Sequence, residues 1–152
     1  MNILFVCTGN ICRSPIAESL LKQKYVENNI EGVVDSAGFS PTTINEPPDE
    51  RAIKAANKRG IELSGCSRLF SQSDFDSFDS IYVMDTKNFR DVKDFARNKK
   101  DIAKIDYLMN VIEPGSNKVV PDPIHSGTTG FDEVITLIDK ITSIITQNNL
   151  KK

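Results

Sequence analysis

The sequence predicts an α/β fold, a doubly wound parallel sheet flanked by helices, with a phosphate-binding loop directly after the first strand. Short apolar runs, typical of strands buried on both faces, alternate along the chain with stretches whose apolar residues recur at helical spacing. A length of 152 residues suits one domain, which we expect to span residues 1–152 and to bury its core without disulfide support.

Four strands are expected from the apolar runs. The run at 2–6 is almost continuously apolar, and the shorter second run ends in Ser36-Ala37-Gly38. Residues 39–48, rich in proline and threonine, are expected to form a loop after it. The expected strands cover residues 2–6, 33–37, 80–84 and 105–109.

Helices are expected between and after the strands, and several begin or end at a recognisable residue. Ser14 is a candidate N-cap with Pro15 at the first helical position, and Asp49 and Asp85 are candidate N-caps of the next two helices. Gly60 is a C-terminal stop for the second helix. The expected helices cover residues 15–28, 49–59, 86–98 and 130–148, the last with its apolar residues in one stripe.

Composition excludes several classes of protein. Nineteen basic against 21 acidic residues leave a net charge of −2, so we expect neither a nucleic-acid nor a membrane partner. Three cysteines and one histidine do not suggest a disulfide framework, a zinc site or a cysteine–histidine catalytic pair, so no metal or other cofactor is expected. The apolar N-terminal run is too short for a signal peptide or a membrane span, which predicts a cytoplasmic protein.

The strongest motif follows the first strand and reads Cys7-Thr8-Gly9-Asn10-Ile11-Cys12-Arg13-Ser14. The backbone N–H groups of such a loop, and the N-terminus of the helix after it, stabilise a bound anion and a cysteine thiolate. The guanidinium of Arg13 offers two parallel donors to phosphoryl oxygens, and the hydroxyl of Ser14 can donate to the sulfur of Cys7. These residues predict a site in which a cysteine attacks a phosphate group.

A general acid is needed as well, because the oxygen that leaves the phosphate must be protonated. Asp122 is the best candidate, since Pro121 and Pro123 restrict its backbone and hold its carboxylate in a defined place. The alternative for Asp122 is an ordinary turn aspartate, and helix capping is the favoured interpretation of Asp85.

Four stretches, in this order, resemble the low-molecular-weight protein tyrosine phosphatases: residues 7–15, Asp35-Ser36-Ala37-Gly38, Met84-Asp85 and Asp122-Pro123. The resemblance spans nearly the whole chain. It implies a four-stranded parallel sheet with flanking helices and metal-free hydrolysis through a phosphocysteine. The implied substrate is a phosphotyrosine-containing protein or a small aryl phosphate.

By position, the resemblance implies that Cys7 is the nucleophile, Arg13 the phosphate clamp and Asp122 the general acid and base. Cys12 resembles the partner of a reversible disulfide with Cys7, and a small buried side chain is the alternative. The implied phosphate-binding and loop-shaping residues are Thr8, Gly9, Asn10, Ile11, Cys12, Ser14 and Ser36.

The chain departs from the family where the substrate would lie. Ile124 and His125 stand where the family commonly has two tyrosines, and Thr42 stands where it often has an aromatic residue on the opposite wall. An aromatic contact is worth about 0.5–1.5 kcal/mol beyond area burial, so we expect substrate binding weakened by roughly one to two orders of magnitude. For His125, a solvated loop position is the alternative to a place at the cleft rim.

We expect a protein tyrosine phosphatase with an acidic pH optimum, and three alternatives stay open. Arginine phosphatases resemble this loop but carry threonine where the chain has Ile11, whose side chain offers no hydroxyl. Arsenate reductases need a cysteine relay, for which this chain has only Cys12 and Cys66. A module that binds phosphate without catalysis does not need a cysteine opposite an acid.

Overall fold

The structure, a computed structural model, describes residues 1–125 and 127–151 and leaves out the side chains of residues 125 and 127–129. Its centre is a sheet of four strands, namely β1 (Ile3–Val6), β2 (Val34–Ala37), β3 (Ser80–Val83) and β4 (Ile105–Tyr107). The strands lie in the order β2-β1-β3-β4, and every neighbouring pair is parallel. The expected parallel sheet is confirmed, and each strand lies inside its expected range.

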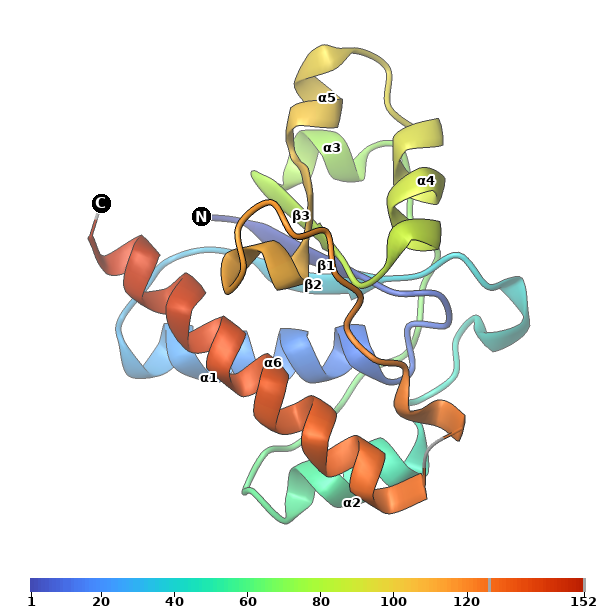
Figure 1. The fold of residues 1–152 in the computed structure, drawn as a ribbon, viewed down its shortest axis with the longest axis vertical. Helices are drawn as coiled ribbons and strands as arrows, with labels where there is room; N and C mark the ends of the chain where they lie inside the picture. The colour runs from blue at the N-terminus through green and yellow to red at the C-terminus, as the bar shows by residue number, and fades with distance from the viewer. Residues whose placement is uncertain (126, 152) are drawn as a thin grey trace.

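Helices cover both faces of this sheet (Figure 1). They are α1 (Arg13–Glu27), α2 (Glu50–Asn57), α3 (Asp74–Ser77), α4 (Thr86–Asp94), α5 (Lys99–Ala103) and α6 (Gly127–Leu150), with 3₁₀ turns at Pro41–Thr43, Leu108–Val111 and Pro123–His125. Helices α1 and α6 pack together on one face with α2 beside them, whereas α3, α4 and α5 lie on the other face.

Strand β1 is buried on both of its faces. Ile3 and Phe5 belong to the core cluster formed with α1 and α6, whereas Leu4 and Val6 belong to the cluster formed with α3 and α4. All four side chains are 0% exposed. Burial on both faces explains why this stretch is continuously apolar rather than alternating.

The first helix begins earlier than expected, and Ser14 is not its N-cap. Because α1 starts at Arg13, Cys12 takes the N-cap position, and its side chain makes no capping hydrogen bond. The hydroxyl of Ser14 instead lies 2.9 Å from the sulfur of Cys7. Pro15 still lies in the first turn, where its missing N–H costs no helical hydrogen bond.

Three other helices differ from their expected bounds. Helix α2 ends at Asn57, before the expected Arg59. The helix expected at 86–98 ends earlier, at Asp94, and a separate helix that was not expected, α5, follows Asn98, which accepts a hydrogen bond from the N–H of Asp101 at 2.9 Å. The last helix extends beyond the expected range 130–148 at both ends. The side-chain hydrogen bond that starts α5 gives no apolar periodicity, so the pattern of hydrophobic residues does not reveal it.

The expected N-caps of α2 and α4 are confirmed. A carboxylate oxygen of Asp49 accepts a hydrogen bond from the N–H of Arg51 at 2.9 Å, and one of Asp85 accepts from the N–H of Asn88 at 2.8 Å. Gly60 follows α2 with a φ of 71°, a left-handed conformation that glycine adopts without strain. These residues set the beginning of both helices and the turn after α2.

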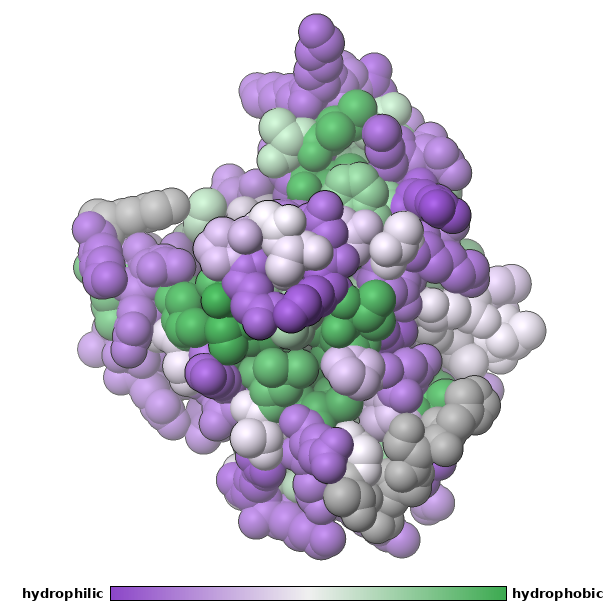
Figure 2. All heavy atoms as spheres, in the orientation of Figure 1, coloured by the Kyte–Doolittle hydropathy of each residue, from purple (hydrophilic) through white to green (hydrophobic). Residues whose placement is uncertain are grey.

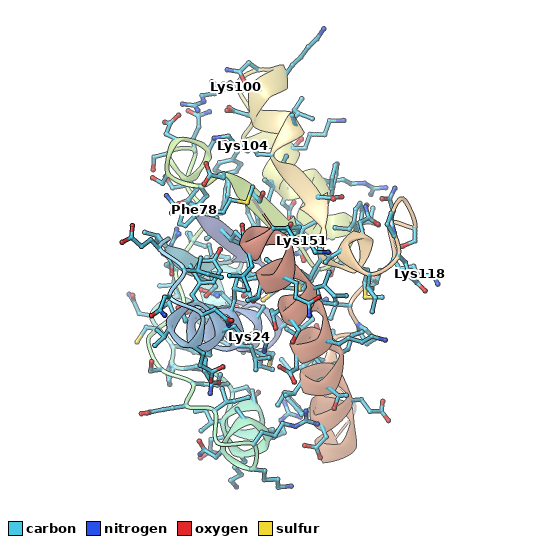
Figure 3. The ribbon with its side chains drawn as sticks, turned by 90° about the vertical axis from the view of Figure 1, so that its left-hand side faces the viewer. Lys24, Phe78, Lys100, Lys104, Lys118 and Lys151 are labelled. Atoms are coloured by element: carbon cyan, nitrogen blue, oxygen red, sulfur yellow. The ribbon has the colours of Figure 1, made fainter. Side chains whose placement is uncertain are left out.

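The surface is mixed in character. Lys24 of α1 pairs with Asp139 of α6, where the two helices lie side by side (Figure 3). Figure 2 shows hydrophilic side chains over most of one face and hydrophobic ones gathered in its centre, over α6 and the segment before it. Within residues 1–125 and 127–151, no helix combines the length and the apolar character that a membrane crossing requires.

Candidate active site

A cavity of about 160 Å³ lies at the carboxyl end of β1. It is lined by Cys7, Thr8, Gly9, Ile11, Cys12, Arg13, Ser40, Thr43, Asp122 and Ile124. Ligands of parallel α/β sheets bind beyond the carboxyl ends of the strands, which is where this cavity lies. The fold thus brings the predicted nucleophile and clamp, which share one loop, together with the predicted acid from a distant part of the chain.

The sulfur of Cys7 is buried and surrounded by hydrogen-bond donors. It lies 2.9 Å from the hydroxyl oxygen of Ser14 and accepts a hydrogen bond from the backbone N–H of Asn10 at 3.3 Å. The side-chain amide of Asn10 donates to the same Ser14 oxygen at 2.8 Å, which leaves the Ser14 proton to be donated to the sulfur. Two donors aimed at one sulfur hold it in a fixed position at the base of the cavity.

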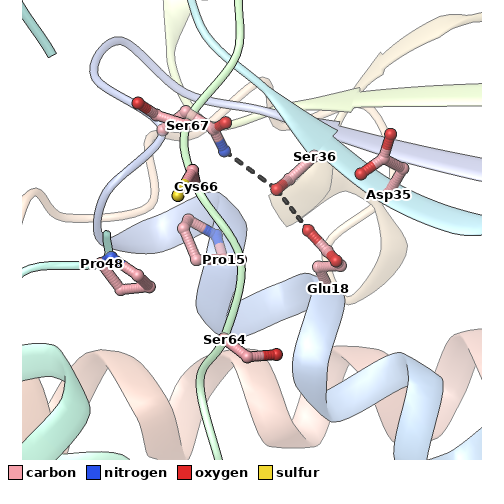
Figure 4. Close-up of a pocket in the computed structure, with 10 residues that line it drawn as sticks. Pro15, Glu18, Asp35, Ser36, Pro48, Ser64, Cys66 and Ser67 are labelled. Carbon is pink, nitrogen blue, oxygen red and sulfur yellow. Dashed lines mark hydrogen bonds between the residues drawn. The ribbon is translucent and has the colours of Figure 1, made fainter. Parts of the chain in front are cut away.

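The side chain of Asn10 stabilises the conformation of the phosphate-binding loop through buried hydrogen bonds. Its backbone is left-handed, with a φ of 56°, and its side chain is almost fully buried. The amide nitrogen donates to Ser14 and, at 2.9 Å, to Ser36, while the amide oxygen accepts from the N–H of Arg68 at 3.0 Å. Ser36 in turn donates to the carboxylate of Glu18 (Figure 4). These bonds fix a strained turn on which the sulfur depends.

Gly38, just after β2, is required by its close approach to the loop. A Cβ atom at this position would lie 2.7 Å from the carbonyl oxygen of Thr8 and 3.0 Å from the backbone nitrogen of Asn10. The same Thr8 oxygen accepts hydrogen bonds from the N–H groups of Phe39 and Ser40, both at 2.9 Å. The segment after β2 therefore supports the loop through backbone contacts that only glycine allows.

Arg13 is 3% exposed, and its guanidinium is fixed by two acceptors. One nitrogen donates to the carbonyl of Val120 at 2.9 Å, and the other donates to the carboxylate of Asp85 at 3.2 Å. Asp85 therefore does more than cap α4 by its bond to Asn88, since it also orients the arginine. Sequence reasoning did not foresee this second contact, because it joins residues far apart along the chain.

Asp122 lies at the side of the cavity with 47% of its side chain exposed. One carboxylate oxygen accepts a hydrogen bond from the N–H of Ile124 at 3.1 Å, and the other lies 3.7 Å from the guanidinium of Arg13. The carboxylate thus has a defined orientation and remains open to solvent, as an acid that exchanges protons with a substrate requires.

The wall of the cavity differs in part from the expectation. Ile124 lines it, but Thr42 is exposed and is not among the lining residues, and its hydroxyl lies 2.7 Å from that of Ser40. Ser40 and Thr43 line the cavity instead. The side chain of His125 lies outside the described part of the chain. None of the lining residues in this part is aromatic.

The three cysteines lie in different surroundings. Burial, together with the charges of Asp49, Cys7 and Asp122, raises the pKa of the Cys12 thiol well above its usual value. Cys66, in contrast, is exposed and borders a second cavity behind the loop (Figure 4). Cys12 therefore stays a protonated thiol where an ordinary cysteine begins to ionise.

We expect iodoacetamide at neutral pH to alkylate Cys66 and to spare Cys12 in the native protein, because alkylation requires an accessible thiolate. Mass spectrometry of tryptic peptides after a timed reaction measures both sites. Denaturing the protein first should make Cys12 react like Cys66. Equal rates in the native state would contradict the burial of the Cys12 thiol.

Comparison with known protein sequences shows one family along the chain. Residues 2–152 match the sequence model of the family described as low molecular weight phosphotyrosine protein phosphatase. The chain is 35% identical over 155 residues to the protein of that name from Schizosaccharomyces pombe, with 99% of this chain and 96% of the relative covered. It is 37% identical over 136 residues to the human protein of that name, with 88% and 85% covered.

Solved structures show the same similarity. A protein tyrosine phosphatase from Entamoeba histolytica superimposes with a TM-score of 0.88 at 32% identity, over 95% of this chain and 94% of that one. The Drosophila arginine phosphatase superimposes with a TM-score of 0.89 at 30% identity, over 97% of both chains. The chain therefore belongs to the low molecular weight phosphotyrosine protein phosphatase family and, with it, to the cysteine-dependent phosphatases.

Proposed function

We propose that this protein hydrolyses phosphotyrosine through a phosphocysteine intermediate on Cys7, with Asp122 as general acid and base. One observation carries the proposal: a single cavity is lined by the Cys7 sulfur, the fixed guanidinium of Arg13 and the carboxylate of Asp122. The partner is a phosphotyrosine-containing protein or a small aryl phosphate. A reducing cytoplasm suits this chemistry, because the nucleophile must stay a free thiol.

In the first step the Cys7 thiolate attacks phosphorus, a sulfur–phosphorus bond forms and the bond to the phenolic oxygen breaks. Asp122 gives its proton to that oxygen, so that a neutral phenol leaves. Arg13 and the N–H groups of the loop hold the other three phosphoryl oxygens while negative charge spreads over them.

In the second step water attacks the phosphocysteine. The carboxylate of Asp122 takes a proton from the water, an oxygen–phosphorus bond forms, and the electron pair of the breaking bond returns to sulfur as a thiolate. The hydroxyl of Ser14, 2.9 Å away, stabilises that thiolate as a leaving group. Inorganic phosphate then leaves, and the first step requires Asp122 protonated again, which favours an acidic optimum.

The wall of the cavity determines how an aryl group is held. Ile11 and Ile124 supply apolar contact, and no aromatic ring is present among the described lining residues. Phe39 does not replace one, because it packs against the rings of Phe70 and Phe95 at 5.5 and 5.7 Å. We therefore expect weak binding of the phenyl ring, with the phosphoryl group supplying most of the affinity.

Phosphoarginine is the second candidate substrate. The hydroxyl-bearing residues Ser40 and Thr43 line the cavity, and the Drosophila arginine phosphatase has a closely similar fold. Against it, Ile11 has no hydroxyl to position the attacking water. A relay for arsenate reduction has less support, because Cys66 borders the other cavity, and a mere binding module does not need Asp122 beside the nucleophile.

The test measures phosphate release from two peptides, one with phosphotyrosine and one with phosphoarginine, at mildly acidic pH with a chelator present. We expect turnover of the phosphotyrosine peptide at a higher kcat/KM than that of the phosphoarginine peptide. The reverse order would assign the protein to the arginine phosphatases. Turnover of neither peptide, with retained phosphate binding, would favour the non-catalytic module.

A further inference from the structure

The segment that carries Asp122 has few backbone groups with which to hold itself in place. Pro121 and Pro123 flank the aspartate and have no N–H to donate. The segment is anchored before the first proline at Val120, whose N–H donates to the carbonyl of Met84 at 2.8 Å and whose carbonyl accepts from Arg13 at 2.9 Å. A second anchor is needed after the second proline to fix the carboxylate.

That second anchor is at Ile124. Its N–H donates to the carboxylate of Asp122 at 3.1 Å, and its carbonyl accepts a hydrogen bond from the guanidinium of Arg51 at 2.8 Å. The N–H that orients the carboxylate therefore belongs to the same residue whose carbonyl Arg51 binds. Arg51 and Ile124 are 73 residues apart along the chain, so this contact is purely tertiary.

Arg51 is itself held rigidly. Its other two nitrogens donate to both carboxylate oxygens of Asp49, at 3.1 and 3.0 Å, and its guanidinium carbon lies 5.0 Å from the centre of the Phe131 ring. The hydrogen bonds from Arg51 hold the pKa of Asp49 below its usual value, so the pair stays charged at neutral pH. A two-pronged contact of this kind fixes the orientation of a guanidinium.

Asp49 also connects this anchor to the phosphate-binding loop. Its backbone N–H donates to the carbonyl of Ile11 at 2.8 Å. The N-terminus of α2 therefore contacts the loop that bears the nucleophile through Asp49 and the segment that bears the acid through Arg51. This N-terminus is placed to keep the loop and the acid segment at a constant separation.

We propose that Arg51 is a positioning residue for proton transfer by Asp122, acting through the carbonyl of Ile124. This proposal rests on the proposed function of Cys7 and Asp122. Arg51 is absent from the residues that line the cavity, so it contributes by holding the acid rather than by touching the substrate. Its loss should slow only reactions in which the leaving group needs a proton.

The experiment compares Arg51→Met and Arg51→Lys with the wild type on two substrates. Phenyl phosphate has a poor leaving group and needs the acid, whereas 2,4-dinitrophenyl phosphate has a good one and needs it little. We expect Arg51→Met to lower kcat/KM about tenfold for phenyl phosphate and less than about twofold for the dinitrophenyl ester, since a small misplacement of a catalytic group already costs rate. Arg51→Lys keeps the charge without the planar fork, so its kcat/KM for phenyl phosphate should lie between those of the wild type and Arg51→Met.

Arg59→Met is the matched control. Arg59 follows α2 and also reaches α6, donating to the carbonyl of Asp132 at 3.2 Å and to the hydroxyl of Thr136. None of its hydrogen bonds goes to the described part of the acid segment. We expect its kcat/KM to match the wild type on both substrates. In an Asp122→Ala background, Arg51→Met should cause no further loss on phenyl phosphate, because the acid that it positions is gone.

Other results would overturn the proposal. An equal loss on both substrates would mean that Arg51 only supports the fold, and no loss with either variant would mean that it positions nothing. Inhibition by inorganic phosphate and the melting temperature are measured alongside, and both should stay near wild type in Arg51→Lys. Failure of the proposed function looks different, because the wild type would then turn over neither substrate, or Asp122→Ala itself would lose equally on both.

Discussion

Cys7→Ser is expected to abolish turnover of aryl phosphates, with a loss of kcat/KM of more than about 10⁴-fold. A serine hydroxyl at this position is not ionised and is a poor nucleophile and a poor leaving group, so both steps of the reaction are slowed strongly. Phosphate binding should survive, because the loop N–H groups and the guanidinium of Arg13 are unchanged. Phosphate release measures the first effect, and calorimetric titration with inorganic phosphate measures the second.

Cys66→Ser is the control for this substitution. Cys66 is an exposed free thiol that borders the cavity behind the loop, not the one that contains Cys7. We expect wild-type turnover from this variant. In the wild type, rapid acid quenching during turnover should trap phosphate on the peptide that contains Cys7. Turnover that persists in Cys7→Ser would exclude this cysteine as the nucleophile.

Asp122→Ala has the second largest expected effect, and it depends on the leaving group. For phenyl phosphate we expect kcat/KM to fall about 10²-fold or more, since a general acid contributes that much when the departing oxygen is strongly basic. For 2,4-dinitrophenyl phosphate the loss should stay below about tenfold.

The control is Asp139→Ala. The side chain of Asp139 is 48% exposed and pairs with Lys24, much as that of Asp122 is 47% exposed and lies near Arg13, but it is on the surface of α6. Removing it should change neither substrate's kcat/KM. A uniform loss on both substrates in Asp122→Ala would show that the aspartate shapes the site without donating a proton.

The parts of the fold that depend on local pattern could be predicted from the sequence. The continuous apolar run of β1 predicts a strand buried on both faces. Asp49 and Asp85, each placed just before a helix, predict the N-caps of α2 and α4. The phosphate-binding loop from Cys7 to Ser14 could be predicted because one short stretch carries the sulfur, the arginine and the hydroxyl. Each of these signals needs only neighbouring residues.

The sequence predicts two roles for Ser14, as a donor to the Cys7 sulfur and as a helix N-cap, and the structure confirms only the first. What could not be predicted depends on contacts between distant segments. Ser40 and Thr43 rather than Thr42 face the cavity because of how the 3₁₀ turn at Pro41–Thr43 is oriented. The anchor from Arg51 has no signal in local sequence, since its partner is a backbone carbonyl far along the chain.

The place of Cys7, the proposed nucleophile, at the end of β1 has a consequence for local stability. Regions that open by local unfolding are those with few buried contacts, and β1 is the opposite, enclosed between β2 and β3 and buried on both faces. Its amides should exchange hydrogen with solvent only when the whole molecule unfolds. The half-exposed Asp122 lies on a segment tied down by a few single hydrogen bonds, whose amides exchange through smaller openings. The proposed nucleophile thus follows a strand that opens only on global unfolding, whereas the proposed acid depends on a few individual hydrogen bonds.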